Sequence, residues 1–278
     1  MGNIKITTLV ENTVPMSPIT LLGEHGLSFY IESKTNKILF DTGQGMVLSG
    51  NAKGLKIDLA GIDTIVLSHG HFDHTGGVKN LIGHNRNFTL IAHPAVFENK
   101  LVARKGNYFP IGIPVGREEI ENSGIKLILE KNSVEIAPGI ITTAEIPLQT
   151  NFEKVMPTFF QGKDGEEVQD TIPDDRAMII DSENGSIVIL GCSHRGIINT
   201  LNHVNWLTKG RKIHAILGGL HLMFATENKI NKIASHLEKF GVEKMILGHC
   251  TGFLATSMLF NIFKGKVIPN IVGNVIEF

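Results

Sequence analysis

The segment Thr64-Ile65-Val66-Leu67-Ser68-His69-Gly70-His71-Phe72-Asp73-His74 is the most informative part of the chain. It opens with an aliphatic run typical of a buried strand, and three histidines and an aspartate follow. Residues two apart face the same side of extended backbone, so His69 and His71 can offer imidazole nitrogens to one metal ion. Asp73 and His74 lie beyond the turn, where they can bind a second ion or orient the ligands of the first. The segment predicts a metal site at a strand end, with a solvated polar loop as the alternative.

The same arrangement, an aliphatic run that leads into glycine and then histidine, occurs three more times. These runs end in Gly191-Cys192-Ser193-His194, Gly218-Gly219-Leu220-His221 and Gly248-His249-Cys250. Another run, Lys37–Phe40, ends in the acidic turn Asp41-Thr42-Gly43. Ligands of α/β sheets bind at the carboxyl ends of the strands, so we expect the histidines of these runs to converge on the first cluster.

For three of the polar residues near strand ends, roles other than metal ligation are also open or are favoured. His221 could be a ligand, a substrate contact or a proton donor. Asp41 is expected to orient a ligating histidine rather than to bind the metal itself. His25 lies in the loop before an expected strand, and both contact with the substrate and capping of the local backbone stay open.

Composition indicates a folded globular protein and disfavours several kinds of partner. The 278 residues include 26 Lys and Arg against 27 Asp and Glu, a net charge of −1, and 42% are hydrophobic. A near-neutral chain without blocks of like charge is not expected to bind nucleic acid. Residues 1–10 lack the features of a secretory signal, and no apolar run approaches about 18 residues, so we expect a cytoplasmic protein without membrane association. Two cysteines are too few for a disulfide framework, which agrees with a reducing compartment.

Short aliphatic runs bounded by turn residues predict strands, and amphipathic patterns between them predict helices. The expected strands are Ile4–Val10, Leu27–Ile31, Lys37–Phe40, Thr64–Leu67, Phe88–Ala92, Ile125–Leu129, Ile140–Thr143, Ala177–Asp181, Ser186–Leu190, Ile213–Leu217, Lys244–Leu247 and Asn270–Ile276. The expected helices are Pro94–Lys105 after its turn, Gly196–Leu207, Glu227–Phe240 and Thr251–Phe260. So many strands exceed one open sheet, which favours an α/β fold of two packed sheets flanked by helices.

A single domain is expected over residues 1–278, because no Pro, Gly and Ser-rich linker divides the chain. The segment 151–176 is polar and shows no clear periodicity, so we expect a loop, lid or insertion that can fold over the site. Its aromatic cluster, Thr158-Phe159-Phe160, could form an apolar wall for a ring-shaped substrate. Its last acidic residues are expected to be solvated: Asp170, Asp174 and Asp175.

The cluster His69-x-His71-x-Asp73-His74, with Leu39-Phe40-Asp41-Thr42-Gly43 and Leu247-Gly248-His249, resembles the metallo-β-lactamase superfamily along nearly the whole chain. The resemblance implies a four-layer αβ/βα sandwich, in which two mixed sheets are flanked by helices, with one or two divalent metal ions at one edge. We expect zinc first, and iron or manganese also suit these ligands. Three motifs are similar to a subgroup often labelled dihydropterin-methyl-ribofuranosylaminobenzene phosphate synthase: Glu24-His25-Gly26-Leu27-Ser28, Gly191-Cys192-Ser193-His194 and Gly248-His249-Cys250-Thr251-Gly252.

The sequence departs from the common family pattern at two ligand positions. No histidine occurs near Glu145-Ile146-Pro147, where many members have a third-motif histidine, and the strand that would deliver a bridging aspartate ends at Cys192 and His194. The resemblance therefore implies that His194 replaces one missing ligand and that His249 is the last ligand. For Cys192 we take a buried, inert thiol as the default and a metal-bound thiolate as the alternative.

These residues predict a metal-dependent hydrolase that cleaves a small ester, phosphodiester, thioester or lactone with a metal-bound hydroxide. Asp73 would be the general base if one ion is bound, and His221 or His25 would protonate the leaving group. Two alternatives stay open: a metal-dependent transferase or synthase of a pterin-like phosphorylated small molecule, as the subgroup label implies, and a non-catalytic metal-binding module. The expected partner is a small-molecule substrate, and no pattern indicates an oligomeric state.

Overall fold

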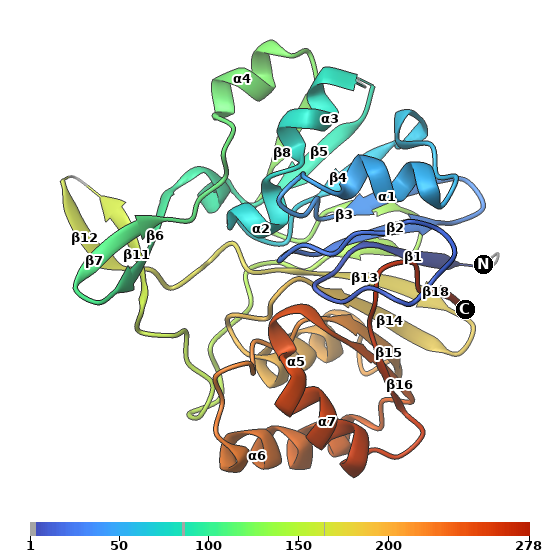
Figure 1. The fold of residues 1–278 in the computed structure, drawn as a ribbon. Coiled ribbons are helices and arrows are strands. Elements are labelled where there is room, and N and C mark those ends of the chain that lie inside the picture. Colours follow the sequence, from blue (N-terminus) through green and yellow to red (C-terminus); the bar gives the residue numbers. More distant parts are fainter. Residues whose placement is uncertain (1–3, 85–86, 164) are drawn as a thin grey trace.

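Two seven-stranded sheets lie at the centre of the computed structural model, which describes residues 4–84, 87–163 and 165–278 (Figure 1). In spatial order, the first sheet consists of β18 (Val275–Glu277), β1 (Lys5–Val10), β2 (Ser28–Glu32), β3 (Lys37–Phe40), β4 (Thr64–Val66), β5 (Thr89–Ala92) and β8 (Lys126–Leu129). The second consists of β17 (Val267–Pro269), β16 (Lys244–Leu247), β15 (Ile213–Gly218), β14 (Gly185–Leu190), β13 (Ala177–Ser182), β10 (Ile140–Thr142) and β9 (Glu135–Ala137). The strand predicted at Asn270–Ile276 is displaced, because most of that run forms the turn between β17 and β18.

Each sheet is antiparallel on one side and parallel on the other. In the first sheet β1, β2 and β3 are antiparallel, and β3, β4, β5 and β8 are parallel. In the second sheet β10, β13 and β14 are antiparallel, and β14 to β17 are parallel. Parallel neighbours bring their carboxyl ends to one edge, which is where α/β sheets bind ligands.

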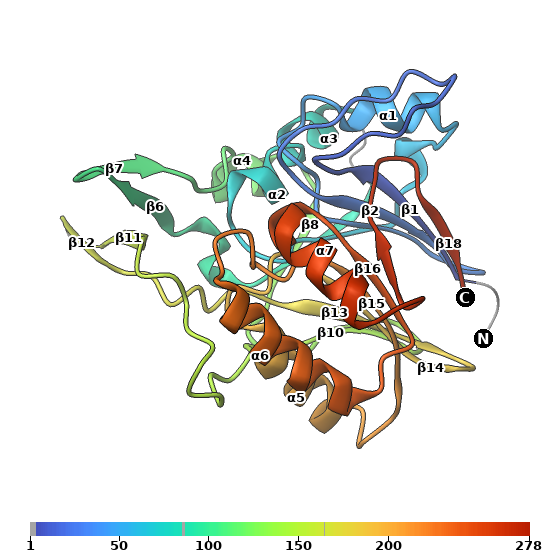
Figure 2. The ribbon, with the colours of Figure 1, turned by 60° about the horizontal axis from the view of Figure 1, so that its bottom comes forward.

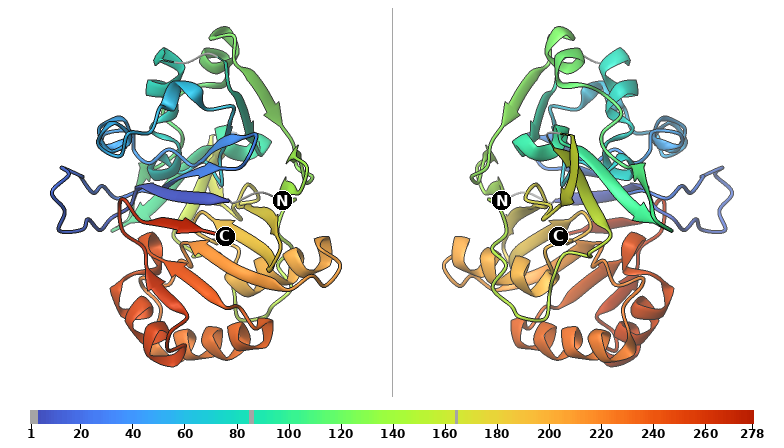
Figure 3. Two further views of the ribbon diagram at one scale, coloured as in Figure 1. Left: turned by 90° about the vertical axis from the view of Figure 1, so that its right-hand side faces the viewer. Right: turned by 90° about the vertical axis from the view of Figure 1, so that its left-hand side faces the viewer.

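Side chains alternate between the two faces of the sheets and so build three hydrophobic cores. On β14, Ile187 and Ile189 pack between the two sheets, whereas Val188 and Leu190 pack against the helices outside. Strands covered on both faces have continuous aliphatic sequences, as these do. The predicted four-layer αβ/βα sandwich is therefore confirmed, and Figure 3 shows its layers from two sides.

Helices cover the outer face of each sheet. On the first sheet they are α1 (Leu48–Gly54), α3 (Val78–His84) and α4 (Arg117–Asn122), and the short α2 (Phe72–Thr75) follows β4. Figure 2 shows those of the second sheet in front of it: α5 (Ile197–Leu207), α6 (Glu227–Leu237) and α7 (Phe253–Ile262). Short 3-10 turns are η1 (Leu59–Gly61), η2 (Pro94–Phe97), η3 (Glu238–Phe240) and η4 (His249–Thr251). None of the described helices is long and apolar enough to span a bilayer.

A four-stranded sheet projects from the sandwich on the side away from the chain termini (Figures 1 and 2). Its order is β12 (Glu166–Gln169), β11 (Phe159–Lys163), β6 (Asn99–Arg104) and β7 (Asn107–Pro110), and we call it the projecting sheet. The helix predicted at Pro94–Lys105 is wrong, because only η2 forms and the chain then continues as β6. Pairing of β6 with β11, about 60 residues away, overrides the local pattern. The segment 151–176 likewise contains the β11–β12 hairpin, which its polar sequence does not predict.

Candidate metal centre

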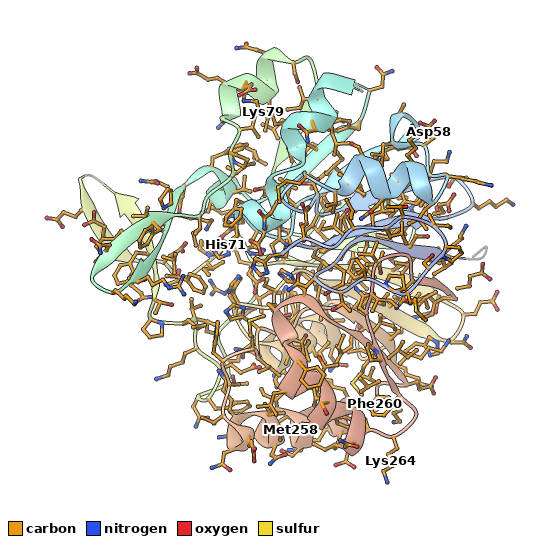
Figure 4. The ribbon with its side chains drawn as sticks, in the orientation of Figure 1. Asp58, His71, Lys79, Met258, Phe260 and Lys264 are labelled. Carbon is orange, nitrogen blue, oxygen red and sulfur yellow. The ribbon has the colours of Figure 1, made fainter. Side chains whose placement is uncertain are left out.

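The predicted strand-end residues meet at one end of the sandwich. β4 leads into the turn with His69 and His71, and α2 carries Asp73 and His74. In the second sheet β14, β15 and β16 lead into His194, His221 and His249. Figure 4 shows His71 at the end of the sandwich from which the projecting sheet extends. Residues 180 positions apart are thus brought together by the parallel halves of the two sheets.

Three buried histidines form what we call the first ligand set: His69, His71 and His194. His69 Nε2 lies 3.0 Å from His71 Nδ1 and 3.1 Å from His194 Nε2. Burial holds the pKa of all three imidazoles well below the usual range, so each is neutral and has one lone pair to offer. Metal–nitrogen bonds of about 2.0–2.1 Å at tetrahedral angles would separate ligand nitrogens by roughly 3.3 Å. The two separations from His69 are close to this value, and the ligand atoms of all three residues lie within 4.8 Å of one another, so the set could hold one divalent ion.

The second ligand set consists of Asp73, His74 and His249. The Nε2 atoms of the two histidines are 3.1 Å apart, and Asp73 Oδ2 lies 3.6 and 3.4 Å from them. Burial alone would raise the pKa of Asp73, but positive His74 and hydrogen bonds from His249 and His25 hold it well below its usual range. Burial alone would lower the pKa of His74, but Asp73 and Asp41 raise it to about 9. This set offers a mixture of imidazole and carboxylate that suits zinc, iron or manganese.

Asp41 contacts His74 directly and is connected to His69 through Ser68. Its Oδ2 lies 2.7 Å from His74 Nδ1, and its two oxygens accept hydrogen bonds from the backbone N–H and the hydroxyl of Ser68, each at 2.7 Å. The Ser68 hydroxyl in turn lies 2.9 Å from His69 Nδ1. A hydrogen bond at the outer nitrogen fixes the tautomer and direction of a ligating imidazole. The structure thus places Asp41 behind the ligand sets, in the position from which it can orient them.

Two residues of the first strand's end also support the second set, and sequence analysis missed both. Asn12 Oδ1 lies 3.1 Å from His249 Nδ1, and buried Glu11 accepts a hydrogen bond of 2.8 Å from the backbone N–H of His249. No local pattern marks these residues, since their partner lies more than 230 positions away in the sequence. His25 lies nearby with a half-exposed side chain, its Nε2 3.2 Å from Asp73 Oδ2 and its ring stacked on that of His249.

The backbone is strained where the strands enter the site. Asp41, Ser193, His221 and His249 follow β3, β14, β15 and β16, and their φ angles are 60°, 56°, 50° and 50°. Positive φ costs a non-glycine residue on the order of 1–3 kcal/mol and persists only where the surrounding structure enforces it. At Gly191, before Cys192, a Cβ would lie only 2.1 Å from Ser68 Oγ, so the two loops can approach only because this residue is glycine. The fold therefore holds these loops in directions that local preference alone would not select.

Cys192 lies between the two ligand sets. Its sulfur is 3.1 Å from His74 Nε2 and within 4.8 Å of a ring nitrogen of His69. Burial raises the pKa of the thiol, so a nearby cation would be needed to hold it as a thiolate. Cys250, to which sequence analysis assigned no site role, lies beside it and groups with Cys192 and His221.

A cavity of about 280 Å³ opens onto both ligand sets. Its polar side includes His25, Asp73, His221 and members of both sets, and its apolar side consists of Val102, Ile111, Met156, Phe159, Met223 and Phe224. His221 lies on the wall with Nε2 3.1 Å from Met156 Sδ and its ring 4.2 Å from that of His194. Phe159 is part of the wall as expected, whereas Phe160 packs against Tyr108.

The acidic residues at the end of segment 151–176 are buried, so the prediction that they are solvated is wrong. Asp170 and Asp174 both form ion pairs with Lys100, which is itself fully buried. Asp175 accepts a hydrogen bond of 2.8 Å from the backbone N–H of Arg195, and burial raises its pKa to about 7. A lysine some 70 residues earlier supplies the compensating charge, which the local sequence cannot reveal.

Comparison with known proteins extends these observations to the whole chain. A model of the metallo-beta-lactamase superfamily matches residues 22–249, a range that contains every member of the two ligand sets. The 7,8-dihydropterin-6-methyl-4-(beta-D-ribofuranosyl)-aminobenzene-5'-phosphate synthase of Methanocaldococcus jannaschii is 35% identical, over 100% of this chain and 98% of that protein. An uncharacterised protein of the same organism is 33% identical over 96% of this chain and 99% of its own length.

Two solved structures resemble this one over nearly the whole chain. A protein described as a metal-dependent hydrolase of the beta-lactamase superfamily superposes with a TM-score of 0.84 at 27% identity, covering 99% of both chains. The metallo-beta-lactamase fold protein YhfI of Bacillus subtilis gives a TM-score of 0.60 at 14% identity, over 99% of this chain and all of that one. At that identity the second likeness concerns the fold alone.

Proposed function

Because the chain belongs to the metallo-beta-lactamase superfamily, we propose that it is a metal-dependent hydrolase of a small ester, phosphodiester or lactone that binds two divalent ions. One observation carries the proposal: two sets of buried ligand atoms lie close together, and members of both line one cavity. Members of the superfamily usually bind divalent metals. The 27% identical structure described as a metal-dependent hydrolase supports the same activity.

Each ligand set would bind one metal ion. His69, His71 and His194 would hold one ion, and Asp73, His74 and His249 the other, with Cys192 in reach of both. Divalent ions held by these residues would lower the pKa of bound water towards about 7 and stabilise negative charge on the substrate. Closed structural zinc sites use four protein ligands, often cysteines. Three ligands in each set beside an accessible cavity favour a catalytic site over a non-catalytic metal-binding module.

His221 is the residue that we assign to proton transfer. With two ions bound, Asp73 would be a ligand rather than a free general base, and protonation of the leaving group still needs a separate donor. His221 lies on the cavity wall beside His194, and its Nδ1 has no hydrogen-bond partner among the described residues. His25, half exposed near Asp73, is placed to contact the substrate.

Elemental analysis of protein purified without added metal tests this proposal, combined with a panel of ester and phosphodiester substrates. We expect two divalent ions per chain, zinc first, and turnover that a chelator removes and the ion restores. His71→Ala and Asp73→Ala should each lose an ion and most of the turnover, whereas His236→Ala on α6, away from the site, should lose neither. Metal and turnover that survive both site substitutions contradict the proposal.

A metal-dependent transferase or synthase is the second candidate. The 35% identity to the synthase of M. jannaschii over the full length favours it, as does Cys192 in place of the bridging carboxylate of hydrolytic relatives. The apolar wall with Phe159 and Phe224 would accommodate a pterin-like ring. Turnover in water labelled with heavy oxygen distinguishes the two, because hydrolysis places solvent oxygen in a product and transfer to another nucleophile does not.

A further inference from the structure

Lys100 on β6 is a fully buried lysine for which the proposed function has no role. Its Nζ lies 2.8 Å from Asp174 Oδ1 and 3.1 Å from Asp170 Oδ2. Burial alone would lower the pKa of this lysine, but the two carboxylates raise it, so it stays charged. A buried ion cluster is costly to desolvate and is weak evidence for stability alone, which suggests a more specific use.

The second oxygen of Asp174 holds the turn of the first ligand set. Its Oδ2 accepts a hydrogen bond of 2.7 Å from the backbone N–H of Gly70, the residue between His69 and His71. On the other side, Gly70 has no room for a side chain, since a Cβ would lie 2.4 Å from the carbonyl oxygen of Val96 and 2.8 Å from Lys100 Cε. The turn is thus clamped between the Asp174 carboxylate and the aliphatic stem of Lys100.

The strand that carries Lys100 also builds the cavity wall. Val102, two residues further along β6, lines the cavity and pairs with Phe159 of β11. The backbone of Lys100 accepts a hydrogen bond of 2.9 Å from Ile111 N–H, and the Ile111 carbonyl accepts one of 2.9 Å from Phe72 N–H. The projecting sheet and the metal-binding turn are therefore connected on both sides of Gly70.

We propose that Asp174, anchored by Lys100, is a positioning residue for the first ligand set. It fixes the His69-Gly70-His71 turn so that both imidazoles converge with His194, and it keeps that turn in register with the projecting sheet that walls the cavity. The inference rests on the proposed function, because it assigns the clamp to one of the two proposed ion sites. The second ligand set is held by other residues, Asp41, Asn12 and Glu11, and should be independent of the clamp.

The chain offers a matched pair of substitutions for the test. Asp174→Asn leaves one acceptor oxygen where two are needed, for Lys100 and for Gly70. Asp170→Asn likewise removes one negative charge beside Lys100. Asp170, however, accepts its hydrogen bond from Ile172 N–H and not from Gly70. Metal-free protein is titrated with Co²⁺, and the visible absorption of each site is followed. His71→Ala identifies the spectral component of the first ligand set.

We expect Asp174→Asn to weaken Co²⁺ binding at the first ligand set by about 10- to 100-fold, the usual effect of removing an outer-shell partner, and to leave the second within about twofold. Asp170→Asn should leave both sites within about twofold. If Asp174→Asn does not fold, Asp174→Glu is the alternative. It keeps a negative charge beside Lys100 but displaces the carboxylate from Gly70, and we expect it to weaken Co²⁺ binding at the first ligand set.

The outcomes separate this inference from the proposed function. Suppose that the wild-type protein binds two Co²⁺ ions. If the Asp174 variants then lose affinity equally at both sites, or at neither, the positioning role is overturned and the hydrolase proposal stays intact. Equal losses in Asp174→Asn and Asp170→Asn also overturn it, because charge alone would then explain the effect. Wild-type protein that binds no Co²⁺ overturns the proposed function and the assignment of the clamp with it.

Discussion

The two ligand sets lie side by side and share Asp41, yet they are held in different ways. The first consists of three neutral imidazoles, and the outer nitrogens of His71 and His194 have no hydrogen-bond partner among the described residues. In the second, both histidines are held at their outer nitrogens, and Asp73 adds a negative charge. Apart from the Ser68 hydroxyl at His69 Nδ1, the first set therefore depends on the backbone of its turn, and the second on charge and hydrogen bonds.

Removal of one ligand from either set should produce the largest effect. We expect His69→Ala and His249→Ala each to lose a different ion and to lower turnover by roughly two to three orders of magnitude, on the scale of losing one preorganised electrostatic group. Elemental analysis and steady-state kinetics measure both quantities. Loss of both ions from either variant would contradict two separate sites, because the sets would then form one cooperative site.

The second largest difference is expected in how the metal affinity of each set depends on pH, because protons compete with the metal ion for the ligand atoms. The pKa of His74 is about 9 in the metal-free protein, so its proton has to leave before an ion binds the second set. Below pH 9 the affinity of this set should fall about tenfold per pH unit, or roughly 100-fold from pH 9 to pH 7. The imidazoles of the first set are already neutral at these values, and its affinity should stay flat.

Calorimetric titration in buffers of different ionisation enthalpy measures the protons released by each ion. We expect about one proton from the second set at pH 7 to 8 and none from imidazoles of the first. Equal proton release from His71→Ala and His249→Ala proteins would contradict the difference between the sets.

Ser68 and Asp41 provide a sharper comparison, since the hydroxyl of Ser68 connects Asp41 to His69 alone. Ser68→Ala should weaken metal binding at the first set by about tenfold and leave the second unchanged, whereas Asp41→Asn should weaken both by about 10- to 100-fold. Co²⁺ titration of the two variants decides this. Loss at the second set in Ser68→Ala would mean that the two sets are coupled through the loops rather than through Asp41.

The smallest effect is expected at the cavity wall, which borders the first set. The Phe159 ring lies 5.1 Å from that of His71 and 5.0 Å from that of His194, whereas Phe160 packs against Tyr108. Phe159→Ala should raise KM by up to about tenfold with little change in kcat, because it removes uniform binding of the substrate. Phe160→Ala is the matched control and should leave both constants near the wild-type values.

The sequence was most informative where the signal is local. An aliphatic run that ends in glycine and histidine identifies both the strand and its functional end, so the sequence alone places His69, His194 and His249 on one edge. The turn after β3 places Asp41 within 2.7 Å of His74 Nδ1, and its role in orienting a metal ligand stays a prediction. The two-sheet fold followed from the number of such runs.

Long-range pairing explains what the sequence could not predict. The sequence of β6 has a helical pattern, and it forms a strand because it pairs with β11. The sequence around Asp170 and Asp174 indicates solvated carboxylates, but in the folded protein both form ion pairs with Lys100. Asn12 similarly acquires its role only when the first and last parts of the chain meet at His249. In each case the partner lies tens to hundreds of residues away, where periodicity and composition carry no information.

The central claim is that two distinct sets of side chains each hold a divalent ion. Anomalous diffraction from crystals of the zinc-loaded protein at the zinc edge tests it most directly. We expect two peaks, one among His69, His71 and His194 and one among Asp73, His74 and His249. A map with no peak at either set, or with density only beside Cys192, His221 and Cys250, would contradict it.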